Sequence, residues 1–270
     1  MENNKVAILG GGNIGTAIAN GLLSSGLYSP ENIFITRRKA EHLASFAEKG
    51  LATGSDNCSA VQQSDIIIIA VTPQQLNDLL TEIKDYVDFQ KHLIISIVSG
   101  ASIKQIREHI GKPIEIIRAM PNTAIAIRES MTCLSTDSTD PSVLEISKKI
   151  FDAVGLSVVI DESLMVPATA LCACGIAFFL RAIRAASQGG IEIGFHAEDA
   201  LLMAAQTAKG AASLLTSMEN HPEREVDKVT TPMGCTISGL NQMEHYGFSS
   251  ALIRGIVTSA EKAAKLYSPK

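Results

Sequence analysis

The fold is decided near the start of the chain by Lys5-Val-Ala-Ile-Leu-Gly-Gly-Gly-Asn-Ile-Gly-Thr-Ala-Ile-Ala-Asn-Gly21. An apolar run, a glycine triplet and a helix-forming segment follow one another, an order that predicts a strand, a tight turn and a helix. Gly10, Gly12 and Gly15 have the spacing of a dinucleotide-binding turn, in which they permit the turn, the approach of a pyrophosphate and the packing of helix on strand. A glycine-rich turn can also simply close a strand, but the order of the elements favours a dinucleotide site.

Strand and helix signals alternate from this turn to about residue 160. The runs 65–71 and 92–98 are apolar on both faces, which is typical of parallel strands covered by helices. The other predicted strands are 32–36, 114–118, 131–135 and 156–160, and the predicted helices are 40–49, 57–63, 141–154 and one that opens at Pro73. Residues 1–160 are therefore expected to form an α/β Rossmann-like, doubly wound sheet.

The residues at the end of strand 32–36 indicate which cofactor fits. NAD-binding folds of this kind place an acidic side chain here to hold the ribose 2′-hydroxyl, whereas this chain continues with Thr36, Arg37, Arg38 and Lys39. An arginine can bind a 2′-phosphate through paired hydrogen bonds and can stack on adenine. The alternative is a solvated basic start to the next helix. The sequence favours NADP, used as NADPH, with NADH as a weaker substitute.

The second half, residues 161–270, is predicted to be an all-α oligomerisation domain. Ala, Leu and Ile recur with helical period through 164–186, 196–218 and 248–266. These helices contain more alanine than one compact bundle needs, and small residues let helices approach closely. We expect a homodimer through this domain, with a tightly packed monomeric bundle as the alternative.

One loop interrupts these helices at 229–240. Pro232 and Gly234 predict a turn before a helix that starts at Cys235. The backbone N–H groups and the hydroxyls of Thr230, Thr231 and Thr236 could then form a pocket for a carboxylate. The loop alone slightly favours the plainer interpretation, a capped helix start.

Composition excludes several classes of protein. Twenty-three basic against twenty-eight acidic side chains give a net charge of −5, and no basic run extends beyond 37–39, so a nucleic-acid surface is not expected. The five cysteines are an odd set without C-x-x-C spacing, which favours reduced thiols over disulfides and predicts no metal site. We found no leader segment and no apolar run of membrane-spanning length, so we expect a cytoplasmic protein without membrane contact.

Several segments together resemble a known family. They are the turn Gly10 to Gly15 with Asn13, Arg118-Ala-Met-Pro-Asn-Thr123, Leu164-Met165 to Ala170-Leu171, Ala204-Ala-Gln-Thr207, Glu219-Asn-His-Pro222, and Thr231-Pro232 to Gly239-Leu240. In this order they resemble pyrroline-5-carboxylate reductase over essentially the whole chain. The resemblance implies an NADP-binding Rossmann domain followed by a helical domain that dimerises, with dimers assembled into larger rings.

The implied reaction is hydride transfer from NADPH to the imine carbon of 1-pyrroline-5-carboxylate, a small cyclic imine, which gives L-proline in the last step of proline biosynthesis. This reaction needs no metal and no covalent nucleophile. It places the substrate carboxylate on the loop from Thr231 to Thr236. Because threonine is too weak an acid to protonate an imine, we expect Thr236 to orient a protonated iminium or a water. The resemblance also places Glu219 where it could balance that cation.

The strand ends and the resemblance together define the expected site. Its cofactor residues are Gly10, Gly12, Asn13, Ile14, Gly15, Thr36, Arg37, Arg38, Asn57, Val71, Thr72, Pro73, Ser99, Gly100, Ala101 and Asn122. Its substrate residues are Thr231, Met233, Gly234, Cys235, Cys172 and Cys174, with Thr236 and Glu219 as the catalytic pair. As single residues, several at the strand ends could equally be ordinary turn formers.

The chain departs from the family pattern inside this site. The family usually has Ser-Gly-Ser-Gly-Pro-Ala where this chain has Cys172-Ala-Cys-Gly-Ile-Ala177, and Pro-Gly-Gly-Thr-Thr where it has Pro232-Met-Gly-Cys-Thr236, while Thr72 replaces a common lysine. Two alternatives therefore stay open: a related reductase of another small cyclic imino acid, and a non-catalytic NADP-binding paralogue. A hydroxy-acid dehydrogenase of similar layout would need a lysine within 164–177, which contains none.

Overall fold

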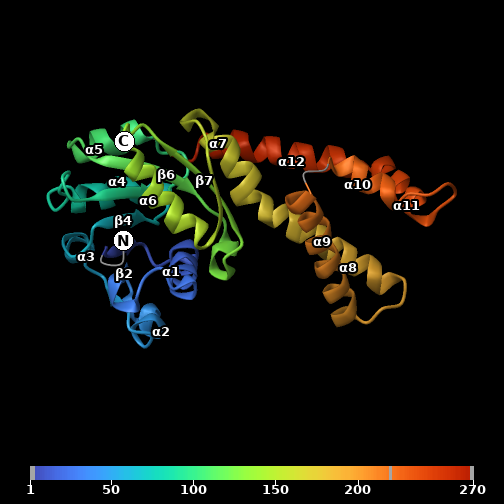
Figure 1. Ribbon diagram of the computed structural model, residues 1–270, viewed down its shortest axis with the longest axis horizontal. Helices are drawn as coiled ribbons and strands as arrows, with labels where there is room; N and C mark the ends of the chain where they lie inside the picture. Colours follow the sequence, from blue (N-terminus) through green and yellow to red (C-terminus); the bar gives the residue numbers. More distant parts are fainter. Residues whose placement is uncertain (1–3, 219–220, 268–270) are drawn as a thin grey trace. The chain divides into compact units, whose positions relative to one another are not determined.

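The computed structural model describes residues 4–218 and 221–267 (Figure 1). The chain divides into two compact units, one formed by Met1–Cys174 with Ser259–Lys270 and the other by Gly175–Thr258. This division by packing differs from the expected boundary between residues 160 and 161. Residues 161–174, which include a π-helical segment, belong to the first unit, and so do the residues from Ser259 onward.

The first unit is built on an eight-stranded sheet in the order β3-β2-β1-β4-β5-β6-β7-β8. Every pair is parallel except β6 and β7, which are antiparallel. The strands are β1 Val6–Leu9, β2 Ile33–Thr36, β3 Ala52–Gly54, β4 Ile66–Ile69, β5 Leu93–Ser96, β6 Glu115–Met120, β7 Ser130–Thr136 and β8 Gly155–Val159. The predicted doubly wound sheet is confirmed, with β3 as an added edge strand.

Helices cover both faces of this sheet. They are α1 Asn13–Ser25, α2 Ala44–Ala47, α3 Asn57–Gln62, α4 Pro73–Ile83, α5 Ile103–Ile110, α6 Pro141–Asp152 and α7 Met165–Ala168, with 3-10 turns at Pro30–Asn32, Ala40–Leu43, Thr123–Ile127 and Glu162–Leu164 and a π-helical segment at Thr169–Cys174. On β1, Val6 and Ile8 pack with α1 and α6, whereas Ala7 and Leu9 pack with α3, α4 and α5. The strands are apolar on both faces because each face has its own core.

The described part of the second unit consists of helices joined by turns and contains no strand. Its elements are α8 Gly175–Glu192, α9 Ala197–Met218, α10 Pro222–Lys228, α11 Cys235–His245 and most of α12 Phe248–Ala263. Within it α8 packs against α9. The predicted all-α second half is confirmed, although α10 was not predicted.

The last described residues, up to Tyr267, belong to the first unit. The Tyr267 hydroxyl donates to Asn77 Oδ1 at 2.8 Å, and Tyr267 packs against the core that α4 and α5 share. This contact explains why the last residues of α12 are grouped with the sheet rather than with the helices before them.

One helical stretch, Glu162–Glu192, is long and apolar enough to cross a membrane by length and composition, because an 18-residue window within it has a mean hydropathy of 2.0. The expectation that no apolar run reaches this length was therefore wrong. Leu171, Phe179 and Leu180 on this stretch are exposed in the single chain. Such a surface calls for a covering partner.

Candidate active site

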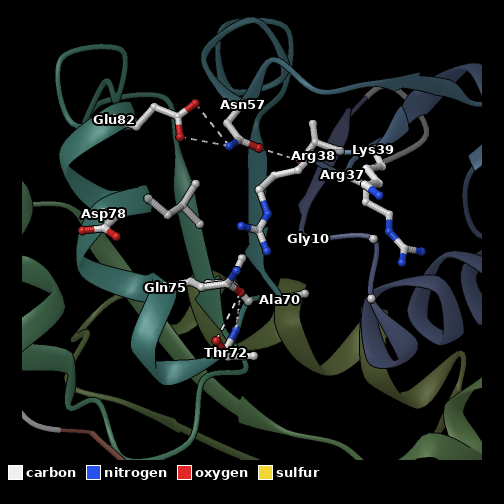
Figure 2. A pocket seen from close by; sticks show the side chains of 15 residues that line it. Gly10, Arg37, Arg38, Lys39, Asn57, Ala70, Thr72, Gln75, Asp78 and Glu82 are labelled. Carbon is white, nitrogen blue, oxygen red and sulfur yellow. Dashed lines mark hydrogen bonds between the residues drawn. The ribbon is translucent and has the colours of Figure 1, made fainter. Parts of the chain in front are cut away.

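A cavity of about 780 Å³ lies beyond the carboxyl ends of β1, β2 and β4 (Figure 2). This is where ligands bind in open α/β sheets. Its lining consists of Gly10, Gly11, Gly12, Thr36, Arg37, Arg38, Lys39, Asn57, Ala70, Val71, Thr72, Gln75, Asp78, Leu79 and Glu82. The cavity brings together eight of the predicted cofactor residues, namely Gly10, Gly12, Thr36, Arg37, Arg38, Asn57, Val71 and Thr72.

The glycine turn has the geometry that a pyrophosphate needs. A Cβ at Gly10, where φ is +117°, would lie 2.4 Å from the Ala70 carbonyl oxygen, and one at Gly15 would lie 2.0 Å from the Gly10 carbonyl oxygen. A Cβ at Gly12 would meet no atom within 4 Å, so the backbone is open there. No side chain caps α1 within the described structure, which leaves the N–H groups of its first turn, at Asn13, Ile14 and Gly15, for a ligand. These features fit a dinucleotide.

The end of β2 supplies the basic side of the cavity. Arg37 is half-buried, and Arg38 and Lys39 are exposed. The buried Thr36 hydroxyl donates to Asn57 Oδ1 at 2.6 Å, and Asn57 Nδ2 donates to the carboxylate of Glu82 at 3.1 and 3.2 Å. Cations from β2 and carboxylates from α4 thus border one cavity (Figure 2).

Thr72 and Pro73 begin α4, as the sequence predicts. Thr72 is the N-cap residue and forms a capping box with Gln75, whose Oε1 lies 3.2 Å from the Thr72 hydroxyl oxygen. Pro73 occupies the first helical position, where a missing N–H costs nothing. The Thr72 side chain therefore stabilises the helix start besides lining the cavity.

The loop after β5 holds Ser99, Gly100 and Ala101. Gly100 has φ +88°, and a Cβ there would lie 3.0 Å from the Cβ of Tyr267, so the C-terminal segment packs over this loop. Ala101 is buried. These three residues lie outside the cavity lining described above.

Asn122 follows β6 and joins it to the π-helical segment. Its side chain accepts from the Ala124 N–H at 3.0 Å and donates to the Cys172 carbonyl at 3.4 Å. Cys172 Sγ lies 3.8 Å from Cys133 Sγ on β7. The Cys133 thiol lowers the pKa of Cys172 to about 7, while the same contact and burial raise the pKa of Cys133. Cys174, at the end of the segment, is half-buried.

The predicted carboxylate loop lies in the second unit as a tight turn before α11. The Gly234 N–H donates to the Thr231 carbonyl at 2.9 Å, and no side chain caps α11 within the described structure. Cys235 and Thr236 therefore carry unpaired N–H groups of the first helical turn. Met233 is fully exposed with φ +59°, a left-handed conformation that glycine adopts more easily than methionine.

The Thr230 hydroxyl does not join the turn, because it donates to the Val226 carbonyl of the preceding helix. Glu219, predicted as catalytic, lies outside the described residues.

The sequence did not mark Gln75, Asp78 and Glu82 as part of the cavity. A signal was available, because residues at spacings of three and four lie on one face of a helix. The helix after β4 must start beside the glycine turn, so its outward face was predictable as part of the lining.

Two family models match the chain. The model described as pyrroline-5-carboxylate reductase dimerisation matches residues 162–266, and the model described as NADP oxidoreductase coenzyme F420-dependent matches residues 5–100. Together they cover the larger part of the glycine-turn half, from its start, and nearly all of the helical half.

Similar proteins and structures agree with these matches. Pyrroline-5-carboxylate reductase 1 of Dictyostelium discoideum is 55% identical over 100% of this chain and 51% of its own length, so the chain spans about half of that relative. Pyrroline-5-carboxylate reductase 2 of the same organism is 49% identical, with 98% of this chain and 94% of the relative covered. The crystal structure of Plasmodium falciparum pyrroline carboxylate reductase with NADP bound superposes with a TM-score of 0.91 at 26% identity, covering 99% of this chain and 100% of that one. The chain belongs to the pyrroline-5-carboxylate reductase family.

Proposed function

We propose that this chain reduces 1-pyrroline-5-carboxylate to L-proline with NADPH, as an oxidoreductase of the last step of proline biosynthesis. The observation that carries the proposal is the 49% identity with a pyrroline-5-carboxylate reductase that this chain matches over 94% of its length. Another relative is about twice as long as this chain. The proposed activity is limited to this reduction and includes no further activity of such a longer protein.

The cofactor site is the cavity beside the glycine turn. The N–H groups at Gly12 to Gly15 hold the pyrophosphate, and Arg37 and Arg38 bind the 2′-phosphate. Asn57 meets the adenosine ribose, while Thr72, Pro73, Asn122 and the loop from Ser99 to Ala101 contact the nicotinamide side. When bound, NADPH supplies the hydride. NADH is accepted more weakly because the arginine contacts to the 2′-phosphate are lost.

The substrate residues act through hydrogen bonding. The N–H groups of Met233 and Cys235, together with the Thr231 hydroxyl, donate hydrogen bonds to the substrate carboxylate. Gly234, whose own N–H bonds the Thr231 carbonyl, leaves room for the Thr231 hydroxyl beside it. The Thr236 hydroxyl orients the iminium nitrogen or a water, since its own pKa is too high for it to act as an acid. Glu219 balances the positive charge of the iminium.

Cys172 and Cys174 replace two hydroxyls with thiols, which are weaker donors, near the cyclic substrate. The proposal includes a role for both in shaping the substrate site. If these side chains face the substrate, the enzyme is expected to prefer a cyclic imine of another ring size.

A homodimer forms through the helical domain, which begins near residue 161, and dimers assemble further into a ring. The match of 162–266 to a dimerisation model supports the dimer. All five cysteines are free, which is consistent with the reducing cytoplasm.

The direct test measures oxidation of NADPH in the presence of 1-pyrroline-5-carboxylate, with piperideine carboxylates and NADH in parallel. Fast turnover of the five-membered ring with NADPH supports the proposal. Preference for the six-membered ring would move the substrate to another cyclic imino acid. Cofactor binding without any turnover would identify a non-catalytic paralogue.

A further inference from the structure

Glu82 lies in the last turn of α4 at the border of the cofactor cavity. Its two carboxylate oxygens accept from Asn57 Nδ2 at 3.2 and 3.1 Å, and Asn57 Oδ1 accepts from the Thr36 hydroxyl at 2.6 Å (Figure 2). The three side chains come from β2, α3 and α4. Asn57 is thus held between a hydroxyl and a carboxylate.

The carboxylate decides which way the Asn57 amide faces. An ionised carboxylate can only accept hydrogen bonds, so the amide nitrogen must face Glu82 and the amide oxygen must face Thr36. The Thr36 hydroxyl is consequently the donor in its bond to Asn57. With Thr36 alone as a partner the amide could turn over, because a hydroxyl can donate to the oxygen or accept from the nitrogen.

This orientation leaves a donor for a ligand. The two Glu82 oxygens lie 3.1 and 3.2 Å from Asn57 Nδ2. Seen from this nitrogen, the angle between the two oxygens is much smaller than the angle between its two N–H bonds, so both N–H bonds cannot point at the carboxylate. One N–H bond therefore bonds Glu82 and the other stays available. A turned amide would instead present its oxygen, which repels a phosphate or competes for the hydrogen of a ribose hydroxyl.

We propose that Glu82 is a positioning residue for the cofactor, which holds the Asn57 amide so that its N–H is offered to the 2′-phosphorylated ribose of NADPH. The inference rests on the proposed use of NADPH. Glu82 would then favour the binding of the anionic cofactor, although its negative charge alone would disfavour it.

Asp78 provides the matched control. It lies one turn before Glu82 on α4, lines the same cavity and carries the same charge. Among the residues that the structure describes, Asn57 takes its carboxylate partner from Glu82 and not from Asp78. Removing either carboxylate relieves repulsion of an anionic ligand, but only removing Glu82 frees the amide.

The experiment is calorimetric titration of the full chain with 2′,5′-ADP, the 2′-phosphorylated adenosine part of NADP. Glu82→Ala should weaken binding roughly fivefold to tenfold, since a hydrogen bond to a charged group is lost or reversed. Asp78→Ala should not weaken it. Glu82→Gln should recover most of the affinity, because a glutamine oxygen can still accept from Asn57. Thermal unfolding of each variant checks that the fold is retained.

A double-mutant cycle with Asn57→Ala separates positioning from direct contact. If Glu82 acts through Asn57, adding Glu82→Ala to Asn57→Ala leaves the affinity for 2′,5′-ADP unchanged. Additive losses would overturn the proposal in favour of direct contact, and tighter binding by Glu82→Ala would overturn it in favour of simple repulsion. If the unaltered protein binds NADH but not 2′,5′-ADP, the NADPH assignment itself is wrong.

Discussion

The Cys172 thiol has a pKa of about 7 because the neighbouring Cys133 thiol donates a hydrogen bond to its thiolate. The ordinary value is 9.0, so near neutral pH the thiolate, which is the nucleophilic form, is far more populated than usual. Alkylation of Cys172 by iodoacetamide should therefore rise with pH through about 7, as measured by mass spectrometry of its peptide.

In Cys133→Ala the donor is gone and burial remains, so the Cys172 pKa should rise and its alkylation near neutral pH should fall roughly tenfold or more. Cys174, two residues away, serves as an internal reference in both proteins. Identical pH profiles of Cys172 in the two proteins would show that Cys133 does not stabilise the thiolate.

Met233 has a left-handed backbone at φ +59°, and its side chain makes no buried contact because it is fully exposed. Glycine adopts this conformation without the steric cost that any Cβ brings. Met233→Gly should thus be more stable to denaturant than Met233→Ala by about 0.5–1 kcal/mol, after the larger unfolded-state entropy of glycine is allowed for. Both variants are compared at one protein concentration. Equal stability would mean that the turn relaxes in solution.

Arg37 and Arg38 line the cavity that α4 also borders (Figure 2). If they bind the 2′-phosphate, replacing both with alanine should raise the KM for NADPH roughly tenfold to a hundredfold, since two charged hydrogen bonds are lost. The KM for NADH should change little, because NADH lacks that phosphate. Steady-state kinetics with both cofactors checks this, and parallel increases would remove the NADP assignment.

Among single residues, those that local sterics require could be predicted from the sequence. Contacts between residues far apart in the sequence could not. Gly10 and Gly15 were predictable because the turn itself excludes a Cβ at each position. The bond between Glu82 and Asn57 was not, since the two side chains meet only after α3 and α4 have packed on the sheet. Thr230 was misjudged for a local reason: its hydroxyl donates to the carbonyl of Val226, four residues earlier in the preceding helix.

Single elements show the same limit. Strands β4 and β5 were predictable because burial on both faces requires an unbroken apolar run. Strand β3, with three residues, is too short to show a pattern. The antiparallel direction of β7 depends on the turn at 123–127 rather than on the strand's own residues, which look alike in either direction.

The pair Arg118 and Glu162 ties three elements together. Glu162 Oε1 accepts from the Ile103 N–H at the start of α5 at 2.7 Å and from Arg118 Nη1 at 3.2 Å. Arg118 on β6 is 4% exposed, and burial lowers its pKa while Glu162 opposes that shift. The buried cation thus depends on a half-exposed carboxylate.

Glu162→Gln keeps an acceptor for the Ile103 N–H but leaves Arg118 without its counter-charge. The free energy of unfolding should fall by about 1–3 kcal/mol, less than for a fully buried pair because Glu162 is partly in water. Glu108→Gln is the matched control, since Glu108 pairs with Lys104 on the exposed face of α5 at 3.8 Å. Denaturant titration should show almost no change there, and equal losses in both variants would contradict a special role for the buried pair.

On the scale of the whole molecule, the second unit has too much exposed apolar surface for a single chain in water. Exposed large side chains include Phe179, Leu180, Ile191, Leu201, Leu202, Met203, Leu214 and Leu215. An interface between subunits explains why Glu162–Glu192 is apolar enough to resemble a membrane span. The dimerisation model that matches 162–266 agrees with this explanation. The alanine-rich helices indicated this from the sequence alone.

Leu202 on α9 offers the sharpest test of this interface, because its side chain is 70% exposed in the single chain. In a symmetric dimer each substitution acts twice, so Leu202→Glu removes two buried leucines, worth about 1.5–3 kcal/mol each, and adds two buried charges. Sedimentation of the unaltered protein should give at least twice the chain mass of 28.7 kDa, and Leu202→Glu should shift it toward that mass. Ile127→Glu is the control, since Ile127 is 73% exposed but lies in the first unit. A monomeric unaltered protein would show that the helices close on themselves within one chain. An equal shift in both variants would contradict a specific contact of Leu202 between subunits.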